Sequence, residues 1–321
     1  MSRRGGILLA VLAAVQIQAC GAPQPAACGA GGEQPHPEVG GQLVFVCYAP
    51  QNHGNLYLLD VATGHVRDLT PDGAWNVDPS WSPDGTRIAF QSTRDGRDNV
   101  YVMNVQSGVV TRLTDGRGFN GFPTWSPDGR YIAYESSRDG ITSTPDPPGY
   151  YRTIYVIGAD GSGLHRLLRA TAVDSGPAWS PSGDLIAFSS DRERAYDIYV
   201  VGLDGADPRQ LTHHAMDGGF GTYPRWSPDG TRLAFNDANS AGTGSEVYVV
   251  MLDGSAPVQI TNDPHSIWEA WPDWSPDSRW IAFARAGEGQ QLFAVHPDGT
   301  GQVQLTTSAG DKILPRWRPS P

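Results

Sequence analysis

Five residues of this chain carry side chains that could ligate a metal ion from neighbouring loops. His213, His214 and Asp217 share one polar stretch, His265 lies in the next, and His53 lies nearer the start of the chain. Imidazoles that converge from several loops can bind a transition metal, and carboxylate oxygens suit Ca²⁺ or Mg²⁺. The alternative is that the adjacent histidines are simply solvated. We predict no bound cofactor and keep a divalent-cation site as the alternative.

A second set of residues could bind a ligand through contact area. It consists of aromatic side chains, and one acid beside them, in stretches that differ between otherwise similar segments of the sequence. Aromatic rings offer a large contact surface at low conformational cost, so they can anchor a peptide or a sugar. The alternative is that most of them pack inside the fold. The set is Trp75, Phe119, Tyr150, Tyr151, Phe220, Tyr223, Trp268, Glu269 and Trp271.

These residues are distributed around a motif, Pro-x-Trp-Ser-Pro-Asp-Gly or a close variant, which first occurs at Pro79–Gly85. Its tryptophan recurs at intervals of 44, 54, 47, 48 and 43 residues, a period typical of propellers, solenoids or repeat arrays. Because this tryptophan is the same in every unit, we predict that it packs in the scaffold. The six copies are Trp81, Trp125, Trp179, Trp226, Trp274 and Trp317.

Each unit has the pattern of four short strands separated by turn residues. In the unit of Trp179, further strands are expected at 184–189, 197–201 and 209–212, rich in β-branched and aromatic residues. A four-stranded antiparallel sheet repeated radially is a propeller blade. The fold class is therefore all-β, a six-bladed β-propeller over residues 41–321. The first unit has no first strand and nothing follows Trp317, so the C-terminal strand should complete the first blade.

In a propeller, the loops that enter each first strand lie on the same face as the loops between second and third strands. The aromatic set and the histidines map to these loops. The largest departure from the repeat, residues 141–152, also falls between a second and a third strand. It is rich in proline and contains Tyr150 and Tyr151, so it is either an interaction loop or a tolerated insertion.

Composition excludes some function classes. The formal net charge is −11, and no Lys/Arg cluster is present, so nucleic acid is not an expected partner. The sequence contains no Gly-x-Ser-x-Gly motif on which a hydrolase nucleophile could sit. Cys28 and Cys47 either pair in an oxidising compartment or remain as a tail thiol and a buried thiol.

The N-terminus has the pattern of an export signal. Arg3 and Arg4 precede a short apolar run, which predicts a signal peptide over residues 1–19. The segment Ile17-Gln18-Ala19-Cys20 is similar to a bacterial lipobox, so Cys20 is the predicted lipidation site; ordinary cleavage near Ala27 is the alternative. Residues 20–40, rich in Gly, Ala and Pro, are predicted to form a disordered tether.

The repeated Trp-Ser-Pro-Asp-Gly-x-x-Ile-Ala-Phe, followed by Ile-Tyr-Val and by Leu-Thr, resembles the WD-like propeller repeat of the TolB family over residues 41–317. The resemblance implies a six-bladed propeller and extracytoplasmic placement. The chain lacks the α/β domain that precedes the propeller in TolB itself, so a role in the Tol–Pal envelope system does not follow from the resemblance.

We therefore expect an exported protein, anchored to the membrane by lipid or otherwise secreted, that binds an envelope or extracellular protein, a peptide or a glycan. A monomer is expected. The alternative function is a metal-assisted lyase or hydrolase that uses the histidines and acids at the channel mouth, and a purely structural role in the envelope remains open.

Overall fold

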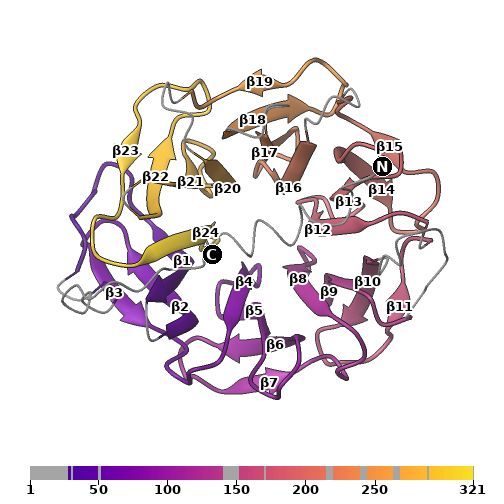
Figure 1. Cartoon of the computed structure of the whole chain (residues 1–321), viewed down its shortest axis with the longest axis horizontal. Coiled ribbons are helices and arrows are strands. Elements are labelled where there is room, and N and C mark those ends of the chain that lie inside the picture. Colours follow the sequence, from indigo (N-terminus) through magenta and orange to yellow (C-terminus); the bar gives the residue numbers. More distant parts are fainter. Residues whose placement is uncertain are drawn as a thin grey trace, which may run out of the picture.

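The computed structural model describes residues 28–29, 32–49, 52–139, 152–169, 171–214, 220–238, 244–262, 268–287 and 289–320. They form six four-stranded antiparallel sheets arranged radially around a central channel, which confirms the predicted six-bladed propeller (Figure 1). No helix among these residues is long and apolar enough to cross a membrane.

The first three blades follow the chain from its described N-terminal part. The first blade contains β1 (Gln42–Ala49), β2 (Asn52–Asp60), β3 (His65–Asp68) and β24 (Asp311–Trp317). The second contains β4 (Asn76–Trp81), β5 (Arg87–Ser92), β6 (Asn99–Asn104) and β7 (Val110–Arg112). The third contains β8 (Asn120–Trp125), β9 (Tyr131–Ser136), β10 (Thr153–Gly158) and β11 (His165–Arg166).

The other three blades complete the ring. The fourth contains β12 (Asp174–Trp179), β13 (Leu185–Ser190), β14 (Asp197–Gly202) and β15 (Arg209–Gln210). The fifth contains β16 (Phe220–Trp226), β17 (Arg232–Ala238), β18 (Ser245–Met251) and β19 (Val258–Gln259). The sixth contains β20 (Glu269–Trp274), β21 (Ile281–Arg285), β22 (Gln291–Val295) and β23 (Val303–Gln304).

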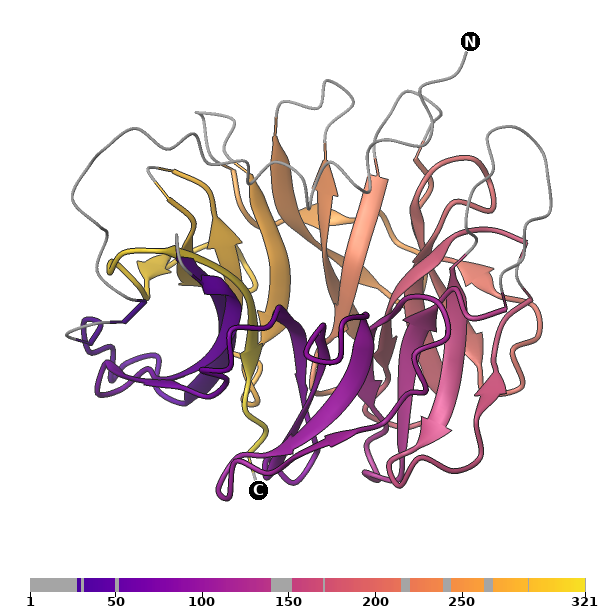
Figure 2. The same cartoon turned by 60° about the horizontal axis from the view of Figure 1, so that its bottom comes forward.

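The motif turn joins the first and second strands of a blade by local hydrogen bonds. In the second blade, Asp84 accepts a hydrogen bond from the Ser82 hydroxyl (2.5 Å) and another from the Thr86 amide (3.0 Å). Gly85 has a φ of 64°, which glycine adopts without a steric penalty. These turns define the lower face of the ring, and the loops that enter the first strands define the upper face (Figure 2).

The six motif tryptophans are buried between blades, as predicted, with 4–9% of each side chain exposed. Two of them bridge neighbouring blades through their indole N–H: Trp81 donates to the Arg316 carbonyl (3.2 Å), and Trp226 donates to the Ala178 carbonyl (2.9 Å). Arginines stack over others, as Arg87 does over Trp125 at 4.5 Å. Their shared position therefore serves blade-to-blade packing.

The ring is closed by its two ends. β24 pairs antiparallel with β1, which gives the first blade the strand order β24-β1-β2-β3 and confirms the predicted closure. Ile313, Leu314 and Trp317 of β24 are all less than 9% exposed. Because β24 supplies the innermost strand, the ring has no unpaired inner edge at the seam.

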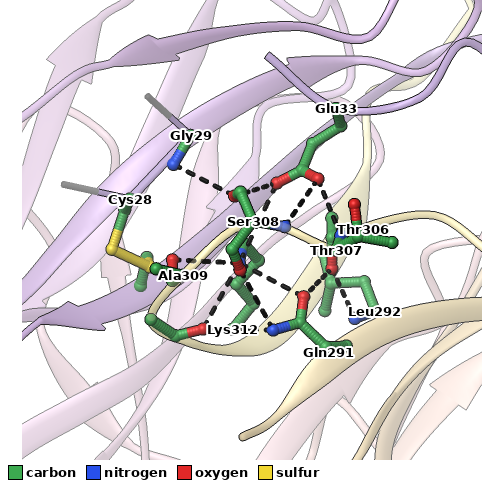
Figure 3. Close-up of polar contacts among 12 residues, drawn as sticks. Cys28, Gly29, Glu33, Gln291, Leu292, Thr306, Thr307, Ser308, Ala309 and Lys312 are labelled. Carbon is green, nitrogen blue, oxygen red and sulfur yellow. Dashed lines mark hydrogen bonds and ion pairs between the residues drawn. A yellow bond between two sulfur atoms is a disulfide. The ribbon is translucent and has the colours of Figure 1, made fainter. Parts of the chain in front are cut away.

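The segment that precedes β1 is packed on the propeller, so the expected disordered tether does not hold for residues 32–40. Cys28 and Cys47 form a disulfide. Glu33 accepts hydrogen bonds from the amides of Thr307 (2.7 Å) and Ser308 (3.1 Å), and it contacts the Ser308 hydroxyl (Figure 3). The composition indicated that this segment has no core of its own. In the structure, the segment is attached to the propeller by the Cys28–Cys47 disulfide and by the hydrogen bonds to the Glu33 carboxylate. The predicted signal peptide and Cys20 lie outside the described residues.

Candidate functional site

Each innermost strand contains a bulge at the residue that precedes Pro-x-Trp. In the second blade, the register with β5 shifts between Val77 and Ser80, and the same shift recurs in the other blades. The residue before the proline has a left-handed backbone, although five of the six are not glycine, and this conformation is strained for bulky side chains. We call these six residues the upper ring. They are Asp78 (φ 51°), Phe122 (52°), Gly176 (60°), Tyr223 (57°), Trp271 (59°) and Leu314 (55°).

Three members of the upper ring, with one neighbour, form a continuous row of aromatic side chains. The ring centroids lie 6.3 Å apart for Phe119 and Phe122, 5.8 Å for Phe122 and Tyr223, and 6.3 Å for Tyr223 and Trp271. The third, fifth and sixth blades supply these rings, so the row crosses the channel. At Gly176 of the intervening blade, an added Cβ would lie 3.7 Å from Tyr223. We call Phe119, Phe122, Tyr223 and Trp271 the aromatic row.

A buried acid lies beside this row. Asp78 is 8% exposed, and its burial, which outweighs attraction to Arg316, raises its pKa to about 7. Burial, followed by the charge of Asp78, also raises the pKa of both Tyr223 and Tyr48. The centre of the channel thus holds a carboxyl group that is partly protonated at neutral pH, next to phenol hydroxyls that stay protonated.

A separate aromatic contact lies at the first and second blades. Trp75 is 39% exposed, stacks on His53 at 6.4 Å, and meets Tyr48 edge-on at 5.7 Å. The stacking places the loop entering β4 beside β2 on the same face, as the sequence predicted. Trp75 is therefore an exposed aromatic surface close to the channel.

Arg152 connects the aromatic row to a buried carboxylate. Its guanidinium lies 4.1 Å above the Phe119 ring and 2.9 Å from a carboxylate oxygen of Glu135, which is fully buried. Ser175 donates to the other oxygen of Glu135 (2.6 Å). These contacts fix the orientation of Phe119 at the edge of the row.

Glu269 has a structural role instead of a position at the mouth. It is fully buried and ion-paired with Arg285. Equivalent pairs tie the upper loops of other blades: Arg94 with Asp72 at 2.9 Å, Arg138 with Asp115 at 3.0 Å, and Arg192 with Asp174 at 2.8 Å. Glu269 therefore belongs to a set of ion pairs that hold the upper loops of the blades in place.

The histidines do not converge among the described residues. His214 lies between two carboxylates, with Nδ1 at 2.6 Å from Asp197 and Nε2 at 2.7 Å from Asp237. Burial lowers its pKa, but the hydrogen bonds to Asp197 and Asp237 outweigh burial and raise the pKa to about 10. His213 is exposed, and no group of three His, Cys, Asp or Glu side chains in the described ranges could hold a metal ion. Asp217 and His265 lie outside those ranges.

Other predicted residues fall in different places. Trp268 is half-buried and forms an isolated parallel bridge with Ser245. Phe220 begins β16, but its side chain lies outside the described part, as do Tyr150 and Tyr151. The prediction placed Phe119, Tyr223 and Trp271 in one aromatic set, and the structure brings them together. That aromatic set did not include Phe122, and no role was predicted for Gly176; Asp78 was considered only as a possible cation ligand on this face. The sequence feature that could have identified these residues is the position before each Pro-x-Trp, where the residue type differs from unit to unit.

The geometry can be compared with known proteins. A family model described as the TolB β-propeller domain matches residues 35–144 and 149–320. The chain belongs to the TolB β-propeller family. Its match begins at residue 35, so it includes residues 35–41 of the packed segment before β1 and leaves out Cys28 and Glu33.

Two curated relatives show how far the TolB-family likeness extends. An uncharacterised protein of Agrobacterium fabrum is 36% identical over 161 residues, which are 50% of this chain and 51% of that protein. The Tol-Pal system protein TolB of Bordetella pertussis is 39% identical over 132 residues, 41% of this chain and 28% of TolB. The matches thus span about half of the first relative and under a third of the second.

Among solved structures, TolB from Acinetobacter baumannii is similar to this TolB-family propeller, with a TM-score of 0.74 and 21% identity. The superposition covers 87% of this chain and 67% of that one. A likeness at this level of identity shows the fold and does not carry a function across.

Proposed function

We propose that this TolB-family propeller is a binding module whose upper mouth holds a segment of another protein. The aromatic row is the observation that carries the proposal. Four rings in consecutive contact, supplied by three blades, form a rigid apolar strip across the channel. Aromatic side chains of this kind dominate the energetics of peptide recognition, because they bury a large area and lose little conformational freedom.

Polar groups beside the aromatic row can form hydrogen bonds that set the orientation of a bound peptide. Asp78 lies next to Tyr223, and the Glu135–Arg152 pair flanks Phe119. The half-buried rings of Phe122, Tyr223 and Trp271 leave part of their surface accessible, and Trp75 adds an exposed indole at the rim. An extended peptide with apolar anchors suits this arrangement better than a small ion does.

We propose in addition that the protein is exported and anchored through lipid on Cys20. The support is the basic and apolar leader, the lipobox-like segment, and the likeness to TolB of Bordetella pertussis, a protein of the Tol-Pal system. Metabolic labelling with an alkyne fatty acid should mark the wild-type protein and leave Cys20→Ala unmarked. Equal labelling of both proteins, or of neither, would count against the anchor.

The binding site is tested by site-specific photo-crosslinking in whole cells. A photoreactive phenylalanine analogue at Trp75 samples the upper mouth, and the same analogue at Val258, which is 61% exposed on β19 of the fifth blade, is the matched control. We expect a discrete protein adduct from position 75 and none from position 258. Trp271→Ala should abolish the adduct without changing thermal unfolding by more than a few degrees.

The outcome separates the kinds of ligand. If protease treatment changes the electrophoretic mobility of the adduct, the ligand is a protein or a peptide. If only glycosidase treatment changes the electrophoretic mobility of the adduct, the ligand is a glycan and the proposed protein ligand is wrong. Equal adducts at positions 75 and 258 would mean that the upper mouth is not selective, and the proposal would fail.

The metal-assisted alternative finds no favourable observation in the described histidines. Both ring nitrogens of His214 already contact carboxylates, and His53 stacks on Trp75. A protein that retains stoichiometric Zn²⁺ or Mn²⁺ through dialysis, and loses it in both His213→Ala and His265→Ala, would nevertheless establish that alternative.

A further inference from the structure

A hollow lies at the lower end of the channel, among the motif turns. Its volume is about 230 Å³, and its lining includes the residue that immediately precedes the motif tryptophan in every blade. We call these six residues the lower ring. They are Ser80, Thr124, Ala178, Arg225, Asp273 and Arg316. As in the upper ring, the blades differ at this position, whereas the flanking proline and tryptophan are shared.

The lower ring carries more positive than negative charge. Its two guanidiniums belong to Arg225 and Arg316, and its one carboxylate belongs to Asp273. Arg225 approaches Asp273 only at 3.9 Å, and Asp273 also accepts the Trp317 amide at 2.7 Å. Burial, together with repulsion from Arg225, lowers the pKa of Arg316 to about 9, so Arg316 remains charged at neutral pH. Burial also lowers the pKa of Arg225, and the charge of Asp273 opposes that shift.

Arg316 is 95% buried, and although the charges of Asp273 and Asp78 attract it, it forms no ion pair among the described residues. Its Nη1 donates to the carbonyls of Pro315 (2.7 Å) and Trp271 (3.5 Å), and its Nε has no hydrogen-bond partner in the described part of the chain. A buried guanidinium without full compensation is costly, so such a group is usually satisfied by an acceptor. The acceptor can be a ligand or ordered water.

Two indoles at the same hollow are also unsatisfied. The Nε1 atoms of Trp125 and Trp317 are buried, and neither has a partner among the described residues. In contrast, the indoles of Trp81 and Trp226 donate to the carbonyl of the neighbouring lower-ring residue. Residues that line the hollow thus carry three spare donors: Arg316 Nε, Trp125 Nε1 and Trp317 Nε1.

The lining beside these donors combines apolar rings with the hydroxyls of Ser80, Thr124, Ser126 and Ser180. Indole rings and the proline rings of the motif turns, including Pro83, Pro127 and Pro181, surround the charged floor. A guanidinium floor matches the two oxygens of a carboxylate, and aromatic and proline walls match a short hydrocarbon group. The small volume excludes a folded partner and suits one residue or a molecule of that size.

We propose that the lower hollow binds a carboxylate carried on a small apolar group, such as the C-terminal residue of a peptide or a free N-acyl amino acid. Arg316 and Arg225 hold the carboxylate, and the motif tryptophans and prolines contact the apolar part. The site is distinct from the aromatic row on the upper face, and it stands or falls without the proposed function.

The direct test is binding of N-acetyl-leucine and of its neutral primary amide, followed by tryptophan fluorescence and by calorimetry. Five of the motif tryptophans line the hollow, so fluorescence should report occupancy. We expect saturable binding of the acid that is at least about tenfold tighter than binding of the amide, because the amide cannot form the charged hydrogen bonds. Equal binding of acid and amide, or binding of neither at millimolar concentration, would overturn the proposal.

Variants assign the binding to the lower ring. Arg316→Gln and Arg225→Gln should each weaken binding of the acid at least about tenfold. Arg279→Gln, which removes the same charge from an exposed position of the sixth-blade motif turn, should leave it unchanged. Because Arg316 lies in the ring-closing strand, Arg225→Gln provides the test if Arg316→Gln does not fold. Unchanged affinity in a folded Arg225→Gln protein would overturn the assignment.

Two further probes distinguish the source of the carboxylate and a simple anion site. N-acetyl-Ala-Ala-Leu that binds more tightly than N-acetyl-leucine supports a peptide chain end, whereas equal affinity supports a free acid. Inorganic phosphate that competes as strongly as N-acetyl-leucine would show that the apolar walls contribute nothing, and the proposed ligand class would be wrong.

Discussion

The indole N–H of Trp81 donates a hydrogen bond to the backbone carbonyl of Arg316, 235 positions further along the chain. This contact joins the second blade to β24, the strand that the C-terminal end of the chain contributes to the first blade. The seam of the ring is therefore stabilised by the β1–β24 pairing and by Trp81. Trp81 is one of the six motif tryptophans that pack between neighbouring blades.

Removal of residues 312–321 should prevent cooperative folding of the whole domain. The truncation deletes Ile313, Leu314 and Trp317, all buried, and each such side chain contributes roughly 2–5 kcal/mol. Their sum is comparable with the whole stability of a domain, about 5–15 kcal/mol. We expect calorimetry to show no cooperative transition. Truncation after Arg318, which retains β24, is the control, and a long truncation that unfolds like the wild type would contradict the closure argument.

Lys312 is the only lysine in the sequence, and it is fully buried beside Glu33. Its Nζ lies 3.8 Å from a Glu33 oxygen and donates to the Gln291 side chain at 3.2 Å (Figure 3). Burial lowers the pKa of Lys312, and the charge of Glu33 opposes this shift. Glu33→Gln should therefore reduce the free energy of unfolding by roughly 3–5 kcal/mol, because it leaves a buried ammonium without its counter-charge.

The buried lysine also provides a readout of the packed N-terminal segment. An amine-directed reagent followed by mass spectrometry should leave Lys312 unmodified in the native wild type and modify it in Glu33→Gln. Combination with Lys312→Met should recover part of the lost stability. Rapid modification of Lys312 in the native wild type would show that the segment does not cover it.

His214 should make stability fall as the pH rises above neutrality. Its folded pKa of about 10 exceeds the ordinary value of 6.5. The native state therefore retains a proton that the unfolded chain releases, and stability is fully present below about pH 6.5 and lost as the pH approaches 10. The contribution is on the order of a few kcal/mol. Chemical denaturation at pH 6 and pH 9 should show a steeper decline for the wild type than for His214→Gln. His213→Gln changes the exposed neighbouring histidine, so its stability should decline between pH 6 and pH 9 as steeply as that of the wild type.

Two equivalent tryptophans should differ in their tolerance of phenylalanine. Trp226 and Trp125 are 9% and 5% exposed, but only Trp226 donates its indole N–H to a buried carbonyl, that of Ala178. Trp226→Phe removes this hydrogen bond, so it should cost about 0.5–1.5 kcal/mol more than Trp125→Phe. Urea denaturation of the two variants measures the difference. Equal destabilisation would mean that the hydrogen bond contributes nothing beyond packing.

The sequence by itself determined the six-bladed architecture, the positions of the strands and the closure by the C-terminal strand. It could do so because each unit repeats the same turn residues and the same strand pattern. In addition, the first unit alone lacks a first strand, so the unmatched strand at Trp317 could only complete that blade. It also assigned the candidate binding residues to loops of one face, since loop position follows from strand order.

Only the tertiary structure decided which of those residues meet. Phe119, Tyr223 and Trp271 come from different blades, and they are joined through Phe122 because every inner strand bulges at the residue before its proline and turns that side chain inward. Sequence reasoning also missed the packing of residues 32–40, because a segment with few apolar side chains is held there by a disulfide, by Glu33 and by the contact of Val39 with the core. The lower ring was equally hidden, since Arg225, Asp273 and Arg316 are far apart in the chain and become neighbours only when the blades close around a common axis.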